Sequence, residues 1–297
     1  MQLETFEVEM DDGAPTVIRH HAKPGALRLY ISHGNGFAVD GYRVFWEPLL
    51  DDFDVVLFDM RNHGMNPFTG ADGHHYEQMA RDLTTVHEKV EARLGASKTV
   101  GVFHSMTSRA AMKNAVELGC PYDGLVLYDP PSVPPRDHPL FDAMRGFELK
   151  LVSWAVERPD RFSSPDELEK TYSEARASAK WLPQARADMA KAVLKQDDEG
   201  YSLSCQRELE ASIYLAALTL NLWPSASELA VPTKLIGADP EGRGGPPTGP
   251  ANCALAKEGS YDYLGMEGVG HLLQIEKPEA CREALYEFLG TLCRGGR

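Results

Sequence analysis

The stretch TVGVFHSMTSRAAM, residues 99–112, decides the fold of this chain. Its first half contains Val100, Val102 and Phe103, the β-branched and aromatic residues that are typical of a short buried strand. Its second half has the composition of a helix start. Ser105 therefore lies on a tight turn from strand to helix. Such a turn holds the hydroxyl away from the backbone, and the first N–H groups of the helix point toward it.

This arrangement is that of a nucleophile elbow, whose usual sequence is G-x-S-x-G. Phe103 and Thr107 stand here in the two glycine positions, and Gly101 lies too early to replace the first of them. The stretch alone leaves two interpretations open, an elbow or an ordinary strand and helix. The rest of the chain has to decide between them.

Length and charge limit the classes of protein that need to be considered. The chain has 297 residues, which suits one large α/β domain or one domain with an inserted subdomain. Its 30 basic and 44 acidic residues give a net charge of −14, which repels phosphate backbones and argues against a nucleic-acid partner. Five cysteines without tight spacing indicate neither a disulfide framework nor a metal site.

No targeting or membrane segment is apparent in the sequence. The start, MQLETFEVEMDDGAP, is acidic and lacks the apolar core of a secretory signal. No window has the apolar length of a membrane span, and no basic run suggests an anionic membrane surface. We therefore expect a cytoplasmic protein. Its expected partner is a small-molecule substrate, and the protein itself could be a monomer or a homodimer.

Apolar segments alternate with helical patterns over most of the chain. Two short antiparallel strands are expected first, at 4–10 and 16–21. Further strands are predicted at 27–32, 53–58, 99–104, 125–128, 232–238 and 261–266, and helices at 42–50, 76–94, 105–119 and 278–292. This alternation predicts an α/β fold with a mostly parallel, doubly wound sheet.

The alternation stops after Pro131. From 134 to 229 only helical spacing is found, at 141–157, 165–178, 180–194 and 203–222, with no strand between these helices. We therefore predict a helical cap, residues 133–229, inserted into a core formed by residues 1–132 and 230–297.

Several reactive side chains follow predicted strands. Parallel sheets place functional groups at the carboxyl ends of their strands, where Ser105, Asp129, Asp239 and His271 are all expected. A serine nucleophile needs a base within hydrogen-bond reach, and the base needs a carboxylate that orients it. Ser105, Asp239 and His271 follow one another in the chain order Ser, Asp, His.

Five motifs in this order resemble the α/β-hydrolase superfamily. They are HGNGF at 33–37, FDMRNHGMN at 58–66, HSM at 104–106, LIGAD at 235–239 and GVGHLLQIEKPE at 268–279. The resemblance implies the α/β-hydrolase fold, Ser105 as nucleophile and His271 as general base. It favours Asp239 as the acid, with Asp129, one strand earlier, as the alternative.

The resemblance also implies an oxyanion hole and a substrate pocket. The oxyanion would be bound by the backbone N–H of Met106 and by one from Asn35 or Gly36. Neither a metal nor a cofactor is expected. The predicted substrate-contacting residues come from the core and from the cap, and they are Phe37, His104, Phe141, Trp154, Trp181, Tyr214 and Leu272.

The function that we predict is that of a cofactor-free serine hydrolase, which cleaves a small or medium carboxylic ester or lactone through an acyl-enzyme. One alternative is a C–C bond hydrolase of a diketone-type substrate, because relatives use the same triad and cap. Another is a receptor-like binding protein with little turnover, which the bulky Phe103 beside the serine would favour.

Overall fold

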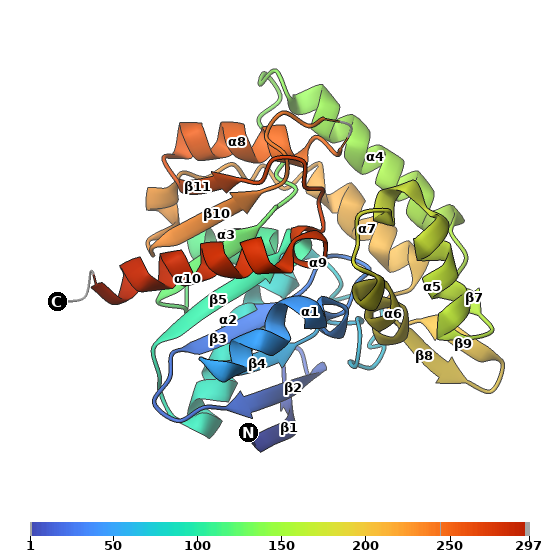
Figure 1. The fold of residues 1–297 in the computed structure, drawn as a ribbon, viewed down its shortest axis with the longest axis horizontal. Coiled ribbons are helices and arrows are strands. Elements are labelled where there is room, and N and C mark those ends of the chain that lie inside the picture. Colours follow the sequence, from blue (N-terminus) through green and yellow to red (C-terminus); the bar gives the residue numbers. More distant parts are fainter. Residues whose placement is uncertain (1, 244, 295–297) are drawn as a thin grey trace.

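A twisted sheet of eight strands forms the centre of the molecule (Figure 1). The computed structural model describes residues 2–243 and 245–294. Across the sheet the strands are β1 (Gln2–Glu9), β2 (Pro15–Ala22), β4 (Asp54–Phe58), β3 (Arg28–Ser32), β5 (Thr99–His104), β6 (Gly124–Tyr128), β10 (Thr233–Gly237) and β11 (Asp262–Gly265). β1 and β2 form an antiparallel hairpin, β2 pairs antiparallel with β4, and all other pairs are parallel. The predicted fold class is confirmed.

Helices cover both faces of this sheet (Figure 1). One face carries α1 (Arg43–Trp46) and α10 (Pro278–Arg294), with the short α9 (Leu273–Glu276) before α10. The other face carries α2 (Tyr76–Leu94), α3 (Ser105–Glu117) and α8 (Thr248–Gly259). Sequence analysis did not predict α8, because its polar and small residues give no clear apolar face. Short 3-10 turns flank α1 on both sides, at Val39–Tyr42 and Glu47–Asp51.

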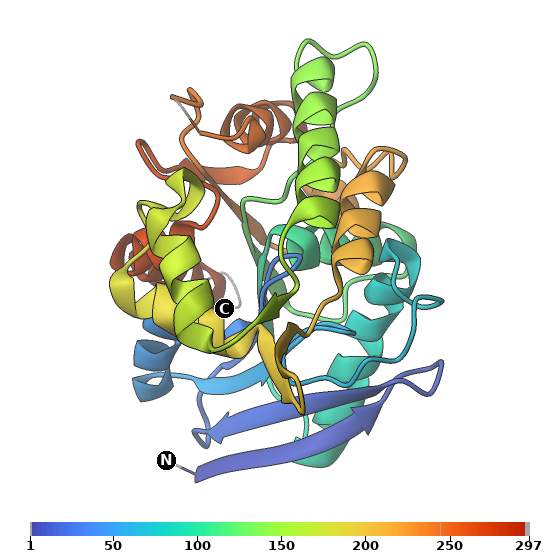
Figure 2. The same ribbon diagram turned by 90° about the vertical axis from the view of Figure 1, so that its right-hand side faces the viewer.

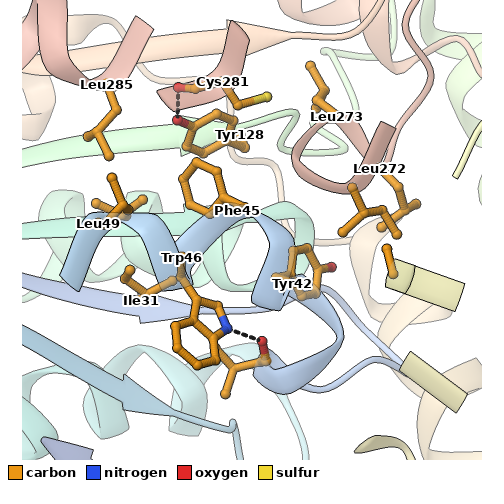
Figure 3. Close-up of a cluster of buried hydrophobic side chains, with 14 of the residues drawn as sticks. Ile31, Tyr42, Phe45, Trp46, Leu49, Tyr128, Leu272, Leu273, Cys281 and Leu285 are labelled. Carbon is orange, nitrogen blue, oxygen red and sulfur yellow. Dashed lines mark hydrogen bonds between the residues drawn. The ribbon is translucent and has the colours of Figure 1, made fainter. Parts of the chain in front are cut away.

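An apolar cluster joins α1 and α10 to the sheet (Figure 3). The ring of Phe45 lies 5.5 Å from that of Tyr128 in an edge-on contact. Two polar groups in this cluster donate hydrogen bonds to backbone carbonyls: the Tyr128 hydroxyl to Cys281 at 2.8 Å and the Trp46 indole to Val39 at 2.9 Å. The four cysteines whose side chains are described are free thiols, and the side chain of Cys293 lies outside the described residues.

The segment between β6 and β10 lies beside the sheet as a separate group of helices, seen face-on in Figure 2. It contains α4 (Phe141–Glu157), α5 (Pro165–Glu174), α6 (Pro183–Ala192) and α7 (Arg207–Ala217), and we call residues 133–229 the cap. The expectation that no strand interrupts these helices was wrong. β7 (Arg161–Phe162), β8 (Leu194–Asp197) and β9 (Gly200–Leu203) form a small antiparallel sheet.

The small cap sheet was missed for a physical reason. Its strands have two to four residues, which is too short to show an alternating pattern.

Within the described ranges, no helix has both the length and the apolar character needed to cross a bilayer.

The apolar cluster supports a stability prediction. Replacing Phe45 by alanine removes a fully buried ring and leaves a cavity beside Tyr128, so the free energy of unfolding should fall by about 3–5 kcal/mol. Urea titration of the variant measures this loss. Leu3→Ala serves as the control, because Leu3 is 55% exposed and its loss should change stability by less than about 0.5 kcal/mol.

Candidate active site

Ser105 lies at the junction of β5 and α3, between the ends of the two strands that flank β5. Its backbone has φ of +52°, a left-handed conformation that non-glycine residues rarely adopt. Gly34 accommodates this turn, since a Cβ there would lie 3.0 Å from the Ser105 Cβ. The stretch at 99–112 is therefore a sharp strand-to-helix turn with the serine at its apex.

The two departures from G-x-S-x-G are accommodated by neighbouring residues. The Phe103 ring packs in the core against Phe58 and Tyr122, and a Cβ on Gly101 would come within 2.4 Å of it. Gly101 therefore makes the room that Phe103 needs. The Thr107 hydroxyl donates to the His33 carbonyl at 2.6 Å. Neither side chain covers Ser105; one fills the core and the other attaches α3 to the loop after β3.

His271 lies against the serine. Its Nε2 is 2.9 Å from Ser105 Oγ, and its Nδ1 is 2.6 Å from Oδ2 of Asp129. The expectation that Asp239 orients His271 is not met, and the alternative acid, Asp129, occupies that position. Asp129 follows β6, which is adjacent to β5, whereas Asp239 follows β10, one strand farther from the serine.

Asp129 is fully buried and held by four hydrogen-bond donors. Oδ1 accepts from the Ala238 N–H and from the Asn252 amide, both at 2.8 Å. Oδ2 accepts from the Thr248 hydroxyl at 2.6 Å in addition to His271. Thr248 and Asn252 belong to α8, the helix that the sequence did not reveal. The donors that hold this carboxylate were therefore not predictable from strand positions alone.

Asp239 has a local structural role instead. Its carboxylate accepts from the Glu241 N–H and from the Gly268 N–H, both at 2.9 Å. These backbone bonds, with the Gly268 bond the larger cause, lower the pKa of Asp239. The carboxylate thus connects the loop after β10 to the loop that carries His271.

Residues 33–37, which we call the oxyanion loop after their predicted role, lie over the Ser105 turn. The predicted donor Gly36 is excluded, because its N–H donates to His63 Nε2 at 3.1 Å. The Asn35 N–H has no acceptor in the described part of the chain. Met106 is the second residue of α3, so its N–H has no partner within the helix. Of the N–H groups predicted to bind the oxyanion, those of Asn35 and Met106 therefore remain.

The predicted substrate-contacting residues have different environments. Phe37 and Trp181 meet edge-on with ring centroids 5.8 Å apart, and Leu272 belongs to the same apolar cluster. Phe141 packs with Met144 in a smaller cluster that α4 shares with α8.

Three other members of that predicted set carry polar contacts. The Tyr214 hydroxyl donates to Glu210 at 3.1 Å. Trp154 is 48% exposed, with the Arg158 guanidinium 4.9 Å from its ring. For His104 the expectation was wrong, because it has no exposed surface and both of its ring nitrogens are hydrogen-bonded to protein atoms.

Buried charges lie where the cap meets the core, and the sequence analysis did not identify them. Glu148 of α4 is 1% exposed and lies 3.4 Å from the guanidinium of Arg109, one helical turn after Ser105. Burial raises the pKa of Glu148 to about 7, although the charges of Arg109 and His271 lower it. A similar pair joins Glu210 to Arg158 at 2.6 Å. Of these residues, only Arg109 had a sequence signal, its position four residues after Ser105.

Among the described residues, 2–243 and 245–294, no group of three histidine, cysteine or acidic side chains could hold a metal ion. His33, His63 and His74 are close to one another, but burial is the largest cause that lowers the pKa of each. The Met60 N–H donates to His33 Nε2 at 3.0 Å, as the Gly36 N–H does to His63, so these two rings fix loops.

The fold and this serine, histidine and aspartate arrangement define a class of protein. The profile of the alpha/beta hydrolase family matches residues 29–284, and the chain belongs to this family. A comparison with curated protein sequences finds no match.

Solved structures with the same fold include several hydrolases. E-2-(acetamidomethylene)succinate hydrolase is similar with a TM-score of 0.80 at 15% identity, covering 97% of this chain and 100% of that one. N-formylmaleamic acid deformylase from Pseudomonas putida S16 has a TM-score of 0.65 at 19% identity, covering 95% and 100%. A thermophilic esterase from Thermogutta terrifontis has a TM-score of 0.67 at 20% identity, covering 98% and 99%. At these identities the similarity establishes the fold alone.

The raised pKa of Glu148 predicts a pH-dependent stability. A carboxyl group whose pKa rises from 4.5 to about 7 on folding destabilises the fold increasingly as pH rises through that window. At 1.36 kcal/mol per pKa unit, the effect is up to about 3 kcal/mol. Glu148→Gln removes this titration, so the variant should gain stability relative to wild type between pH 4.5 and 8.

Urea titrations of both proteins at pH 5 and pH 8 measure this difference. Glu287→Gln is the control, since Glu287 lies on an exposed part of α10 and should give the same difference at both values. A Glu148→Gln difference that does not change with pH would contradict the assignment of a raised pKa.

Proposed function

We propose that this protein is a serine hydrolase that cleaves a small or medium carboxylic ester or lactone through an acyl-enzyme. The observation that carries the proposal is the continuous hydrogen-bonded line from Asp129 through His271 to Ser105, with bonds of 2.6 and 2.9 Å. A base in contact with a hydroxyl and oriented by a buried carboxylate is what activation of a serine requires.

In the proposed reaction, Ser105 Oγ attacks the substrate carbonyl while its proton passes to His271 Nε2. Asp129 stabilises the resulting imidazolium and fixes the proton on Nδ1. The N–H groups of Asn35 and Met106 bind the oxyanion. The imidazolium then returns its proton to the leaving alcohol oxygen, which departs as the acyl-enzyme forms. Water, deprotonated by His271, attacks the acyl-enzyme, and the proton returns to Ser105 as the acid is released.

The binding-protein alternative rested on Phe103, and its position weakens that argument. Phe103 lies in the core beneath the turn and takes no space above Ser105. The C–C hydrolase alternative uses the same three residues, so substrate comparison has to separate it from ester cleavage. The buried charges of Glu148 and Glu210 on the cap favour testing polar as well as apolar acyl groups.

A fluorophosphonate probe tests the nucleophile. The probe should label the wild-type protein at Ser105, and Ser105→Ala should not be labelled, as intact-protein mass spectrometry can measure. Ser108→Ala is the matched control, because the Ser108 hydroxyl donates to the Phe103 carbonyl at 2.7 Å within the same helix start and should leave labelling intact. A folded wild type that resists the probe would instead support a binding protein.

A panel of p-nitrophenyl esters, lactones and vinylogous diketo acids then identifies the bond that is cleaved. Faster turnover of the esters or lactones supports the proposal. Turnover restricted to the diketo acids would move the assignment to C–C cleavage.

The identity of the acid is tested by two asparagine variants. Asp129→Asn should lower kcat by about 10³- to 10⁴-fold, because the amide favours the wrong tautomer of His271. Asp239→Asn should lower kcat by less than about 10-fold, since within the described residues that carboxylate accepts its hydrogen bonds from backbone N–H groups. Steady-state kinetics on the best ester measures both, with circular dichroism to verify folding. The reverse ranking would return the acid role to Asp239.

A further inference from the structure

His104, the residue before the serine, lies directly under the general base. Its ring centroid is 4.8 Å from that of His271, with the two planes tilted by 45°. Its Nε2 is 2.8 Å from the His271 carbonyl oxygen and its Nδ1 is 2.8 Å from the Tyr42 hydroxyl. Because His104 has no exposed surface, these two protein groups are its partners in place of substrate.

The direction of each hydrogen bond in this chain follows from the chemistry of its members. A carbonyl oxygen can only accept, so Nε2 of His104 carries the proton and donates to His271. Nδ1 is then an acceptor, and the Tyr42 hydroxyl donates to it. The Tyr42 oxygen in turn accepts from the Gly34 N–H at 3.3 Å. One tautomer and one hydroxyl orientation therefore satisfy the whole chain.

This hydrogen-bond chain connects the parts of the proposed site. Gly34 belongs to the oxyanion loop, His104 precedes Ser105, and His271 is the base. A Cβ on Gly34 would meet Nδ1 of His104 at 2.9 Å, so the loop and the imidazole are in direct contact. The Tyr42 ring lies in the apolar cluster of Figure 3, where its position is fixed by packing.

Burial also keeps the side chains of His104 and Tyr42 in one protonation state. It lowers the pKa of His104 well below its usual value, and the nearby charge of His271 lowers it further. Burial likewise raises the pKa of Tyr42. A proton taken up by His271 during the reaction is therefore not lost to the neighbouring imidazole.

We propose that Tyr42 and His104 are positioning residues, which hold the oxyanion loop and the His271 backbone in register with Ser105. The effect of this positioning on catalysis rests on the proposed function, but the coupling of the 33–37 loop to the loop that carries His271 does not. A displacement of about 1 Å in a reacting group can cost on the order of 100-fold in rate. Loss of this hydrogen-bond chain should thus lower kcat and leave KM nearly unchanged.

The test replaces Tyr42 by phenylalanine, which keeps the ring and removes only the hydroxyl. We expect kcat on the best ester, and the rate of fluorophosphonate labelling, to fall by about 10- to 100-fold with KM changed less than about 2-fold. Hydrogen exchange of the backbone amides in 33–37 and 267–273 should become faster. Tyr261→Phe is the matched control, since it also loses a buried tyrosine hydroxyl bond, 2.9 Å to the Pro224 carbonyl, away from the site.

A second pair of variants separates the hydrogen bond from packing. His104→Gln retains a donor that can reach the His271 carbonyl, whereas His104→Phe keeps the ring volume without one. We expect Gln to retain more activity and slower exchange in 267–273 than Phe.

The outcomes distinguish this inference from the proposed function. If Tyr42→Phe behaves like Tyr261→Phe in both kinetics and exchange, the positioning role is overturned. If wild type is neither labelled nor active on the panel, yet exchange in the two loops still accelerates in Tyr42→Phe, the proposed function fails and the coupling of the loops stands.

Discussion

The site depends on one constraint, that neighbouring parallel strands end at the same edge of the sheet. β5 delivers Ser105 to that edge and β6, its neighbour, delivers Asp129. His271 arrives on a loop after β11 and contacts both, with one ring nitrogen on each. A change in the register between β5 and β6 would separate the serine from the carboxylate, because each of these residues comes directly after the last residue of its strand.

Burial distinguishes the imidazoles that surround the proposed site. Burial is the largest cause that lowers the pKa values of His33, His63 and His104, and each of these rings holds a loop through hydrogen bonds to backbone or tyrosine. His271 differs because its side chain is 20% exposed and its Nδ1 contacts a carboxylate. The three buried imidazoles thus connect loops within the core, whereas the proposed base faces both solvent and Asp129.

The cap is attached to the core by polar contacts beside the proposed oxyanion hole. The Asn35 amide donates to the Glu210 carbonyl at 2.8 Å, and a Cβ on Gly36 would lie 2.3 Å from the Glu210 carboxylate. Glu148 pairs with Arg109 on the helix that begins at Ser105. These contacts attach the cap directly to the 33–37 loop and to α3, the two elements on either side of Ser105.

The sequence by itself determined the fold class and the elbow serine, because alternating apolar strands and helices, and the order of five motifs, are local properties of the chain. It also predicted that His271 lies at the carboxyl end of a strand. It favoured Asp239 over Asp129 as the acid and was wrong about which carboxylate contacts His271, because both follow buried strands and nothing local says which strand lies next to β5. Only the tertiary structure places Asp129 against His271, through strand order and the donors of α8. It also showed His104 to be buried under His271, since burial arises from segments far apart in the chain.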